Sequence, residues 1–476
     1  MTKAQLTKLL IESFPYKPTE GQINLLEQTS EFLLDTEENN LLVINGYAGT
    51  GKTSIVKAIT DVLNTFKHEC LLLAPTGRSA KVLSSYTQKQ AFTIHKKIYR
   101  IHLDNNGYTK CSLLPNIHKN TLFIVDEASL IADYSTQSEG GFSSGRSLLA
   151  DLINFIYNGN NNRLIIIGDA AQLPPIGMNE SPALNLKFLN ASFGLNIRSC
   201  ELTEVVRQEE NSGILQNATL LRKAIISNNS LLFKFQLKGF NDIIKLDSCD
   251  LEDAINQAYS TYSPEETMII CRANKKTNLF NKQIRYGILG REEKINGGDY
   301  LMCVKNNYYW LDENTKPGFL ANGDIMQVNR VKKTHQMYDF NFAEVSFTLC
   351  DYPDDVQIEA MIMLDTIDSE NASLTYSTAQ QFYEKVVQDY MDIPNKNERL
   401  KEVKKNPFLN AIQVKYAYAM TCHKSQGGQW KAVFVDQDFY NESMENVTYL
   451  RWLYTALTRA SEKIYLVNFA ERFFEK

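Results

Sequence analysis

LLVINGYAGTGKTS, from Leu41 to Ser54, is the stretch of sequence that decides the fold. Its apolar start is typical of a buried parallel strand, and from Gly46 it fits the phosphate-binding pattern GxxxxGK[ST] in full. Glycines let backbone N–H groups wrap phosphate oxygens, and the helix expected from Ser54 onward places those oxygens at a helix N-terminus. The residues expected to bind nucleotide here are Gly46, Ala48, Gly49, Thr50, Gly51, Lys52, Thr53 and Ser54.

Two carboxylates complete the expected catalytic centre. Lys52 should reach the β and γ phosphates, and Thr53 should hold Mg²⁺. A second apolar strand, Thr121–Val125, ends in Asp126 and Glu127. Carboxylates at this place suit Mg²⁺ coordination by Asp126 and activation of the attacking water by Glu127. An acidic pair at a strand end is common by itself, but beside a P-loop it predicts ATP and Mg²⁺ as ligands.

Two further strands define the fold class. Arg163–Ile167 runs into GDAAQLPP, where the amide of Gln172 is placed to touch the γ-phosphate. Cys70–Leu73 runs into APTGRS. Strands that alternate with helices predict an α/β fold with doubly wound parallel sheets.

Composition limits the class of protein but does not identify its substrate. A chain of 476 residues is too long for one compact core, and 43% hydrophobic with 22% charged residues is typical of ordered globular modules. The net charge of −5 argues against nucleic-acid binding, but a whole-chain sum does not detect a local basic strip. Eight dispersed cysteines predict no disulfide framework or metal cluster, and with no long apolar run they favour a cytoplasmic protein.

Seven motifs in fixed order resemble one family. They are GYAGTGKTS, APTGRSA, DEAS, GDAAQLPP, VVRQ, TCHKSQGGQW and LYTALTRA. This set resembles the superfamily 1 helicases, and within them the RecD-like and Dda-like branch, superfamily 1B. The resemblance runs from Gln22 to about Lys463. It implies an ATP-dependent DNA helicase that moves 5′→3′ on single-stranded DNA and unwinds duplex, built from two RecA-like lobes.

The resemblance also assigns nucleotide contacts. Gln22 matches the glutamine that reads adenine, although an ordinary polar helix residue is the alternative. Gln172 matches the γ-phosphate sensor. Arg207 and Arg459 match two arginines that neutralise charge in the transition state, against a generic surface role. Gly428 belongs to the same nucleotide set, and here Gly428-Gln429 stands where many relatives have an acidic residue near the ribose.

The nucleic-acid contacts implied by the family are mostly neutral. Hydroxyls, amides and a few cations suffice to track phosphates, which reconciles DNA binding with an acidic chain. Loop hydrogen bonding is the alternative for each single residue. The set is Pro75, Thr76, Thr93, His95, Pro174, Arg272, Asn274, Thr421, His423, Lys424 and Ser425.

Two insertions are expected. Asn106-Gly107 predicts a hairpin turn between strands Ile98–Leu103 and Tyr108–Leu114. In the family this insertion, about 96–120, is a pin that parts the duplex, with Asn105–Tyr108 near its tip; a hairpin covering a sheet edge is the alternative. The second insertion matches an Src-homology-3-like barrel. Its candidate elements are strands Asp324–Val331, Ala343–Leu349 and Val356–Leu364, and a helix near Ser377–Tyr390.

The expected division follows from these motifs. Residues 1–203 form the first lobe, 204–331 and 409–476 the second, and 332–408 the barrel insertion. Val414–Ala419 is expected to return to the second sheet, and Trp452–Arg459 to form a helix that carries the arginine.

Several alternatives stay open at this point. They are an RNA helicase, an accessory motor subunit of a recombination or repair complex, a P-loop phosphotransferase and a catalytically silent binding module. The expected partners are single-stranded DNA and duplex junctions, with a monomeric motor, no membrane, and replication or repair proteins as candidates.

Overall fold

The computed structural model describes most of the chain. The described residues are 1–103, 109–133, 147–204, 212–227, 233–312, 315, 318–352, 357–438 and 446–475. Two predictions therefore lie outside the described residues: Arg207 and the hairpin tip Asn105–Tyr108.

The first lobe is built on a six-stranded parallel sheet, in the order β3-β2-β6-β7-β1-β8. Leu42 and Ile44 of β1 pack on one face, while Leu41 and Val43 pack on the other. Burial on both faces explains the continuous apolar runs predicted as strands. The strands are β1 (Asn40–Gly46), β2 (Cys70–Ala74), β3 (Ala91–Thr93), β6 (Leu122–Val125), β7 (Arg163–Gly168) and β8 (Asn196–Leu202).

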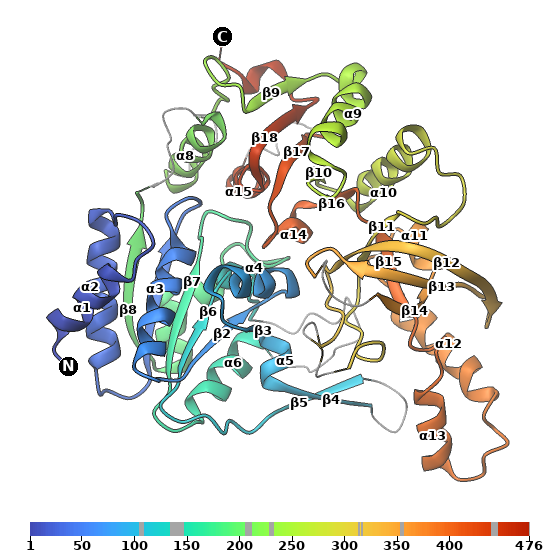
Figure 1. The fold of residues 1–476 in the computed structure, drawn as a ribbon, viewed down its shortest axis with the longest axis horizontal. Helices are drawn as coiled ribbons and strands as arrows, with labels where there is room; N and C mark the ends of the chain where they lie inside the picture. Colours follow the sequence, from blue (N-terminus) through green and yellow to red (C-terminus); the bar gives the residue numbers. More distant parts are fainter. Residues whose placement is uncertain are drawn as a thin grey trace.

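Helices cover both faces of this sheet (Figure 1). Apolar residues of α1, α2 and α3 pack with Leu42 and Ile44. Apolar residues of α5, α6 and α7 pack with Leu41 and Val43. The helices are α1 (Lys3–Glu12), α2 (Glu20–Leu34), α3 (Lys52–Thr65), α4 (Gly77–Thr87), α5 (Ile94–Ile98), α6 (Leu148–Tyr157) and α7 (Leu186–Phe193).

The second lobe contains a five-stranded parallel sheet, in the order β16-β10-β17-β18-β9. Its strands are β9 (Ile243–Leu246), β10 (Thr267–Cys271), β16 (Ala419–Thr421), β17 (Trp430–Asp436) and β18 (Ala460–Val467). Its helices include α8 (Gly213–Ile226), α9 (Leu251–Tyr262), α10 (Asn274–Gln283), α14 (Cys422–Ser425) and α15 (Val447–Leu457). The predicted helix Trp452–Arg459 is therefore too long, because α15 ends at Leu457 and Arg459 lies in the short link to β18.

A closed five-stranded barrel is inserted between β10 and β16 (Figure 1). Its strands are β11 (Tyr300–Cys303), β12 (Ile325–Met337), β13 (Phe340–Leu349), β14 (Ile358–Met363) and β15 (Ile412–Tyr416). After β14 the chain forms α11 (Asp365–Asp368), α12 (Tyr376–Gln388) and α13 (Lys396–Lys404). The predicted strands and the helix near Ser377–Tyr390 are thus confirmed.

The barrel's ends correct two predictions. The boundaries 332 and 408 are too narrow, because β11 pairs with both β12 and β15 and so closes the barrel from Tyr300 to Tyr416. Val414–Ala419 does not return to the second sheet as one strand. Val414 belongs to β15 of the barrel, and the sheet resumes at Ala419 in β16.

The predicted hairpin is also present. β4 (Tyr99–Leu103) and β5 (Thr109–Leu113) pair antiparallel, with Tyr99 opposite Leu113 and Leu103 opposite Thr109. In Figure 1 the hairpin leaves the first lobe and runs towards the side of the molecule that holds α13. Within the described part of the chain, no helix combines the length and apolar character needed to cross a membrane.

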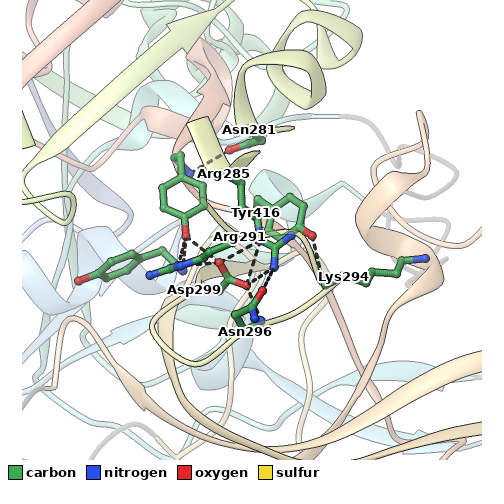
Figure 2. A network of polar contacts seen from close by, with 9 residues as sticks. Asn281, Arg285, Arg291, Lys294, Asn296, Asp299 and Tyr416 are labelled. Carbon is green, nitrogen blue, oxygen red and sulfur yellow. Dashed lines mark hydrogen bonds and ion pairs between the residues drawn. The ribbon is translucent and has the colours of Figure 1, made fainter. Parts of the chain in front are cut away.

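A buried ion network joins the barrel to the second lobe (Figure 2). Arg285 lies in a π-helical turn, Ile284–Ile288, directly after α10. Its Nε donates to both carboxylate oxygens of Asp299 at 3.0 Å, and Arg291 donates to the same carboxylate at 2.7 Å. The phenol of Tyr418 donates to it at 3.0 Å. Because Asp299 directly precedes β11, this network fixes the start of the barrel on the lobe.

Candidate active site and nucleic-acid face

The P-loop has the geometry of a phosphate cradle. Gly49 and Gly51 adopt φ values of 79° and 83°, a left-handed conformation that glycine tolerates without strain. Helix α3 starts at Lys52 and its N-cap, Gly51, provides no side-chain hydrogen bond. The N–H groups of its first turn are therefore open to an anion. The Nζ of Lys52 donates to the carbonyls of Gly46 at 2.6 Å and Tyr47 at 3.0 Å, so it lies over the loop.

Asp126 and Glu127 follow β6 at the carboxyl edge of the sheet. Burial and the charge of Glu127 raise the pKa of Asp126 to about 7, against the lowering effect of the Glu127 N–H and Lys52. That N–H donates to Asp126 Oδ1 at 2.9 Å. Glu127 has a φ of 52°, and its Oε2 is buried with no hydrogen-bond partner among the described residues. A partly buried carboxylate pair of this kind is costly without a cation, so these residues fit Mg²⁺.

Gln172 lies in a tight turn beside the P-loop. β7 pairs with β1, and Gly168 lies opposite Asn45, so residues 169–173 emerge next to the phosphate cradle. The Oδ1 of Asn45 accepts from the N–H of Ala170 at 3.0 Å, which ties the turn to the end of β1. The Oε1 of Gln172 is buried and has no partner among the described residues. This position suits an amide that contacts a nucleotide phosphate.

Gln22 also reaches the P-loop. Its Nε2 donates to the carbonyl of Thr50 at 3.0 Å, and its Oε1 accepts from the N–H of Thr19 at 3.0 Å. Thr19 and Gln22 form the capping box of α2. The amide therefore links the start of α2 to the phosphate cradle, and its predicted contact with adenine stays a prediction.

Arg459 and Gly428 lie together in the second lobe. The buried guanidinium of Arg459 donates from Nε to the carbonyl of Thr455 at 3.0 Å and from one terminal nitrogen to the carbonyl of Gly428 at 3.2 Å. A Cβ on Gly428 would lie 2.7 Å from the Trp430 ring and 2.9 Å from Arg78 Nε. A side chain at this position would therefore have to displace Trp430 or Arg78.

Most of the predicted nucleic-acid residues follow the edge strand of each sheet and its neighbour, while Pro174 lies in the turn after β7. Ala74 lies opposite Thr93 in β2 and β3, so the segments at Pro75–Thr76 and Thr93–His95 share one edge of the first sheet. Cys271 lies opposite Thr421 in β10 and β16, so Arg272–Asn274 and Thr421–Ser425 share one edge of the second.

These two edges meet across the lobes. A Cβ on Gly427 would lie 3.0 Å from Ser79 Cβ and 3.3 Å from Thr76 Oγ1. Burial lowers the pKa of His95 to about 4 and also lowers that of His423, so both imidazoles are neutral at pH 7. The guanidinium of Arg272 lies 5.4 Å from the ring centroid of Tyr449, which holds it against α15. The joined edges present mainly neutral hydrogen-bonding groups.

Comparison with known proteins agrees with this arrangement. Residues 19–229 match the AAA domain family, and residues 416–467 match the UvrD-like helicase C-terminal domain family. The chain is 26% identical to the ATP-dependent DNA helicase dda of Enterobacteria phage T4 over 325 residues, 66% of this chain and 68% of that protein. These matches show that the chain is similar to ATP-dependent DNA helicases in both lobes.

Two further similarities extend over nearly the whole chain. An uncharacterized protein of Acanthamoeba polyphaga mimivirus is 23% identical over 499 residues, covering 90% of this chain and 96% of the relative. A solved structure of two Pif1 helicases that unwind forked double-stranded DNA superposes with a TM-score of 0.50 at 14% identity. That alignment covers 96% of this chain and 94% of the other chain, and it shows a shared fold.

The sequence analysis missed two residues that shape this site. Arg78 places its guanidinium 4.2 Å from the ring centroid of Trp430, across the lobes. Tyr454 places its phenol against the P-loop and is described below. Both residues lie inside motifs that the sequence identified, APTGRSA and LYTALTRA, so their position in those motifs was the available signal.

Proposed function

We propose that the protein is an ATP-dependent DNA helicase that moves 5′→3′ along single-stranded DNA and unwinds duplex. One observation carries the coupling between chemistry and movement. The turn that holds Gln172 in the first lobe is hydrogen-bonded by the second lobe: the N–H of Leu173 donates to Thr455 Oγ1 at 2.8 Å, and Gln426 Nε2 donates to the Leu173 carbonyl at 3.0 Å. A structural change at the Gln172 turn would therefore be transmitted to the second lobe through these two hydrogen bonds.

The residues of the cradle have separate roles in this proposal. Lys52 binds the β and γ phosphates, and Gln22 reads the adenine. Thr53 and Asp126 would hold Mg²⁺, which when bound neutralises charge on the phosphates. Glu127, with its unpartnered Oε2, orients the attacking water and takes up its proton.

The second lobe supplies the remaining charge. Arg207 and Arg459 stabilise the negative charge that develops on the transferred phosphoryl group. Because Arg459 is held by carbonyls of its own lobe, hydrolysis requires the two lobes to approach each other. Such a requirement makes the catalytic cycle and lobe movement one process.

The joined strand edges form the proposed path of single-stranded DNA. Thr76 and Thr93 on the first lobe, and Thr421 and Lys424 on the second, would alternate in holding backbone phosphates. Neutral donors and few cations predict a modest salt dependence, with a log–log slope of about −0.7 per phosphate neutralised. The hairpin β4–β5 is proposed as the pin that parts the duplex, and the barrel as the element that covers the bound strand.

Duplexes with one single-stranded tail test this function. With ATP, we expect unwinding of the DNA duplex that carries a 5′ tail and not of the duplex that carries a 3′ tail. Unwinding only from a 3′ tail would overturn the direction. Matched RNA tails separate a DNA helicase from an RNA helicase, because preference for the RNA substrates would favour the latter.

A further inference from the structure

We propose that Tyr454 is the positioning residue that reports occupancy of the P-loop to the second lobe, through its hydrogen bonds to Ala48 and Asp169. The inference rests on the proposed function and assigns the coupling to one side chain. Tyr454 lies in the last turn of α15, in the second lobe, while both of its partners belong to the first lobe.

The phenol joins two parts of the nucleotide site. The N–H of Ala48 in the P-loop donates to the Tyr454 oxygen at 2.9 Å, and the Tyr454 hydroxyl donates to Asp169 Oδ2 at 2.8 Å. Tyr454 is 1% exposed and Asp169 is fully buried. Burial and the charge of Asp169 raise the pKa of Tyr454 far above that of a free tyrosine, so the hydroxyl keeps its proton and the direction of both bonds is fixed.

Asp169 connects the phenol to the γ-phosphate sensor. Its other oxygen accepts from the N–H of Ala171 at 3.0 Å, and its carbonyl accepts from the N–H of Gln172 at 3.2 Å. The carboxylate therefore shapes the turn that carries Gln172. A change in the Tyr454–Asp169 bond alters the support of that turn.

Ala48 connects the phenol to the phosphate cradle. A backbone amide has one hydrogen to donate, so the Ala48 N–H given to Tyr454 is not fully available to a second acceptor. A phosphate oxygen that takes this N–H must displace the phenol or weaken its bond. Side chains of Tyr47, Ala218 and Arg222 line a small pocket beside Tyr454 and Ala48.

The same helix turn holds the arginine. Thr455, the next residue, accepts from the Leu173 N–H with its hydroxyl and from Arg459 Nε with its carbonyl. A displacement of Tyr454 moves the backbone that restrains Arg459. The connected path runs from the Ala48 amide through Tyr454 and Thr455 to Arg459, and so from phosphate binding to the residue proposed to complete catalysis.

The test removes one oxygen atom. Tyr454→Phe keeps the buried ring and loses both hydrogen bonds. We expect the ATPase kcat stimulated by single-stranded DNA to fall about ten-fold, which corresponds to about 1.4 kcal/mol and to one hydrogen bond with a charged group. The KM for ATP should stay unchanged or decrease, since the Ala48 N–H no longer has a competing acceptor. Base pairs unwound per ATP hydrolysed should also fall.

Tyr157→Phe is the control. Tyr157 lies on α6, away from the nucleotide site, and its hydroxyl donates to the carbonyl of Asn40 at 2.8 Å within the first lobe. Loss of this hydroxyl should leave the stimulated kcat within about two-fold of the wild type. A Tyr454→Phe protein that behaves like Tyr157→Phe, or that loses activity only through a raised KM, would overturn the inference.

A double-mutant cycle separates the effect of losing the Tyr454–Asp169 hydrogen bond from a general loss of structure. Asp169→Asn combined with Tyr454→Phe should cost no more than the larger single change, because both remove the same connection. Additive losses of the stimulated kcat in the double variant would count against the proposed connection between Tyr454 and Asp169. If the wild-type ATPase shows no response to DNA, the proposed function fails first and the inference fails with it; if the wild type responds and Tyr454→Phe responds equally, only the inference fails.

Discussion

Arg285 and Asp299 form an ion pair in which neither side chain is exposed to solvent, at the point where the barrel starts (Figure 2). Removing one partner of a buried pair leaves an uncompensated charge, which costs roughly 3–5 kcal/mol. Asp299→Ala should lower the free energy of unfolding by this amount in urea denaturation followed by circular dichroism. The substitution leaves two arginines without their carboxylate partner, since Arg291 also donates to Asp299.

An exposed pair on the barrel supplies the comparison for Asp299. Lys332 and Glu359 lie 2.6 Å apart, and their side chains are 33% and 63% exposed. Glu359→Gln should cost less than about 1 kcal/mol, because solvent screens this pair. Equal losses for the two variants would show that burial of the Asp299 network does not fix the barrel to the lobe.

Lys52→Ala should greatly slow ATP hydrolysis. The ammonium group is the only side-chain cation placed over the phosphate cradle among the described P-loop residues 46–54, and its interactions in the present structure are with two loop carbonyls. Loss of a charge directed at the transition state typically lowers kcat by about 10²–10³. Lys57→Ala, on the same helix and paired with Asp61 at 3.3 Å, should retain activity. A steady-state ATPase assay on both variants checks this, and normal turnover by Lys52→Ala would contradict the proposed site.

Local sequence patterns were sufficient for the sheets but not for the connections between distant elements. Each apolar run next to a motif of the first lobe formed a parallel strand, because strands buried on both faces are apolar throughout. In the barrel, β11 was not predicted, and β15 was predicted as part of a strand of the second sheet. Their pairing joins residues far apart in the sequence, such as Leu301 and Tyr416, which no local pattern indicates. Tyr454 was missed for a related reason: its partner Ala48 is 406 residues away, and nothing local distinguishes its hydroxyl from those of other aromatic residues on α15.

The raised pKa of Asp126 makes stability depend on pH. An aspartate in an unfolded chain has a pKa of about 3.9, and burial beside Glu127 raises that of Asp126 to about 7. The folded state therefore binds this proton more tightly. Its contribution to stability is complete below the unfolded pKa and is lost as pH rises through about 7.

Asp126→Asn removes this titration and checks the sign. Without Mg²⁺ or nucleotide, the variant should gain more stability over the wild type at about pH 8 than at about pH 5.5. Urea denaturation at the two pH values measures the difference. Asp151→Asn serves as control, because Asp151 is a buried carboxylate of the same lobe that accepts from Tyr99 at 2.8 Å, away from the acidic pair. A gain in the free energy of unfolding for Asp126→Asn that is the same at both pH values would contradict the raised pKa of Asp126.

Gly428→Ala should uncouple the contact between the lobes. The new Cβ would lie 2.7 Å from Trp430 and 2.9 Å from Arg78 Nε, closer than such atoms approach, so the Arg78–Trp430 stack must separate. The Gly428 carbonyl, which accepts from Arg459, would shift with it. We expect the DNA-stimulated kcat to fall by about ten-fold, as for the loss of one charge-assisted hydrogen bond, and tryptophan fluorescence to change.

Gly287→Ala is the control for this substitution, because a Cβ at Gly287 meets no atom within 4 Å. Its ATPase rate and fluorescence should match those of the wild type. Arg78→Met distinguishes the two consequences of the clash: it removes the stack but leaves the Gly428 carbonyl in place. If Arg78→Met retains the stimulated rate while Gly428→Ala does not, the support of Arg459 is the essential part. Full activity of Gly428→Ala would show that the DNA-stimulated rate depends neither on the Arg78–Trp430 stack nor on the support of Arg459 by the Gly428 carbonyl.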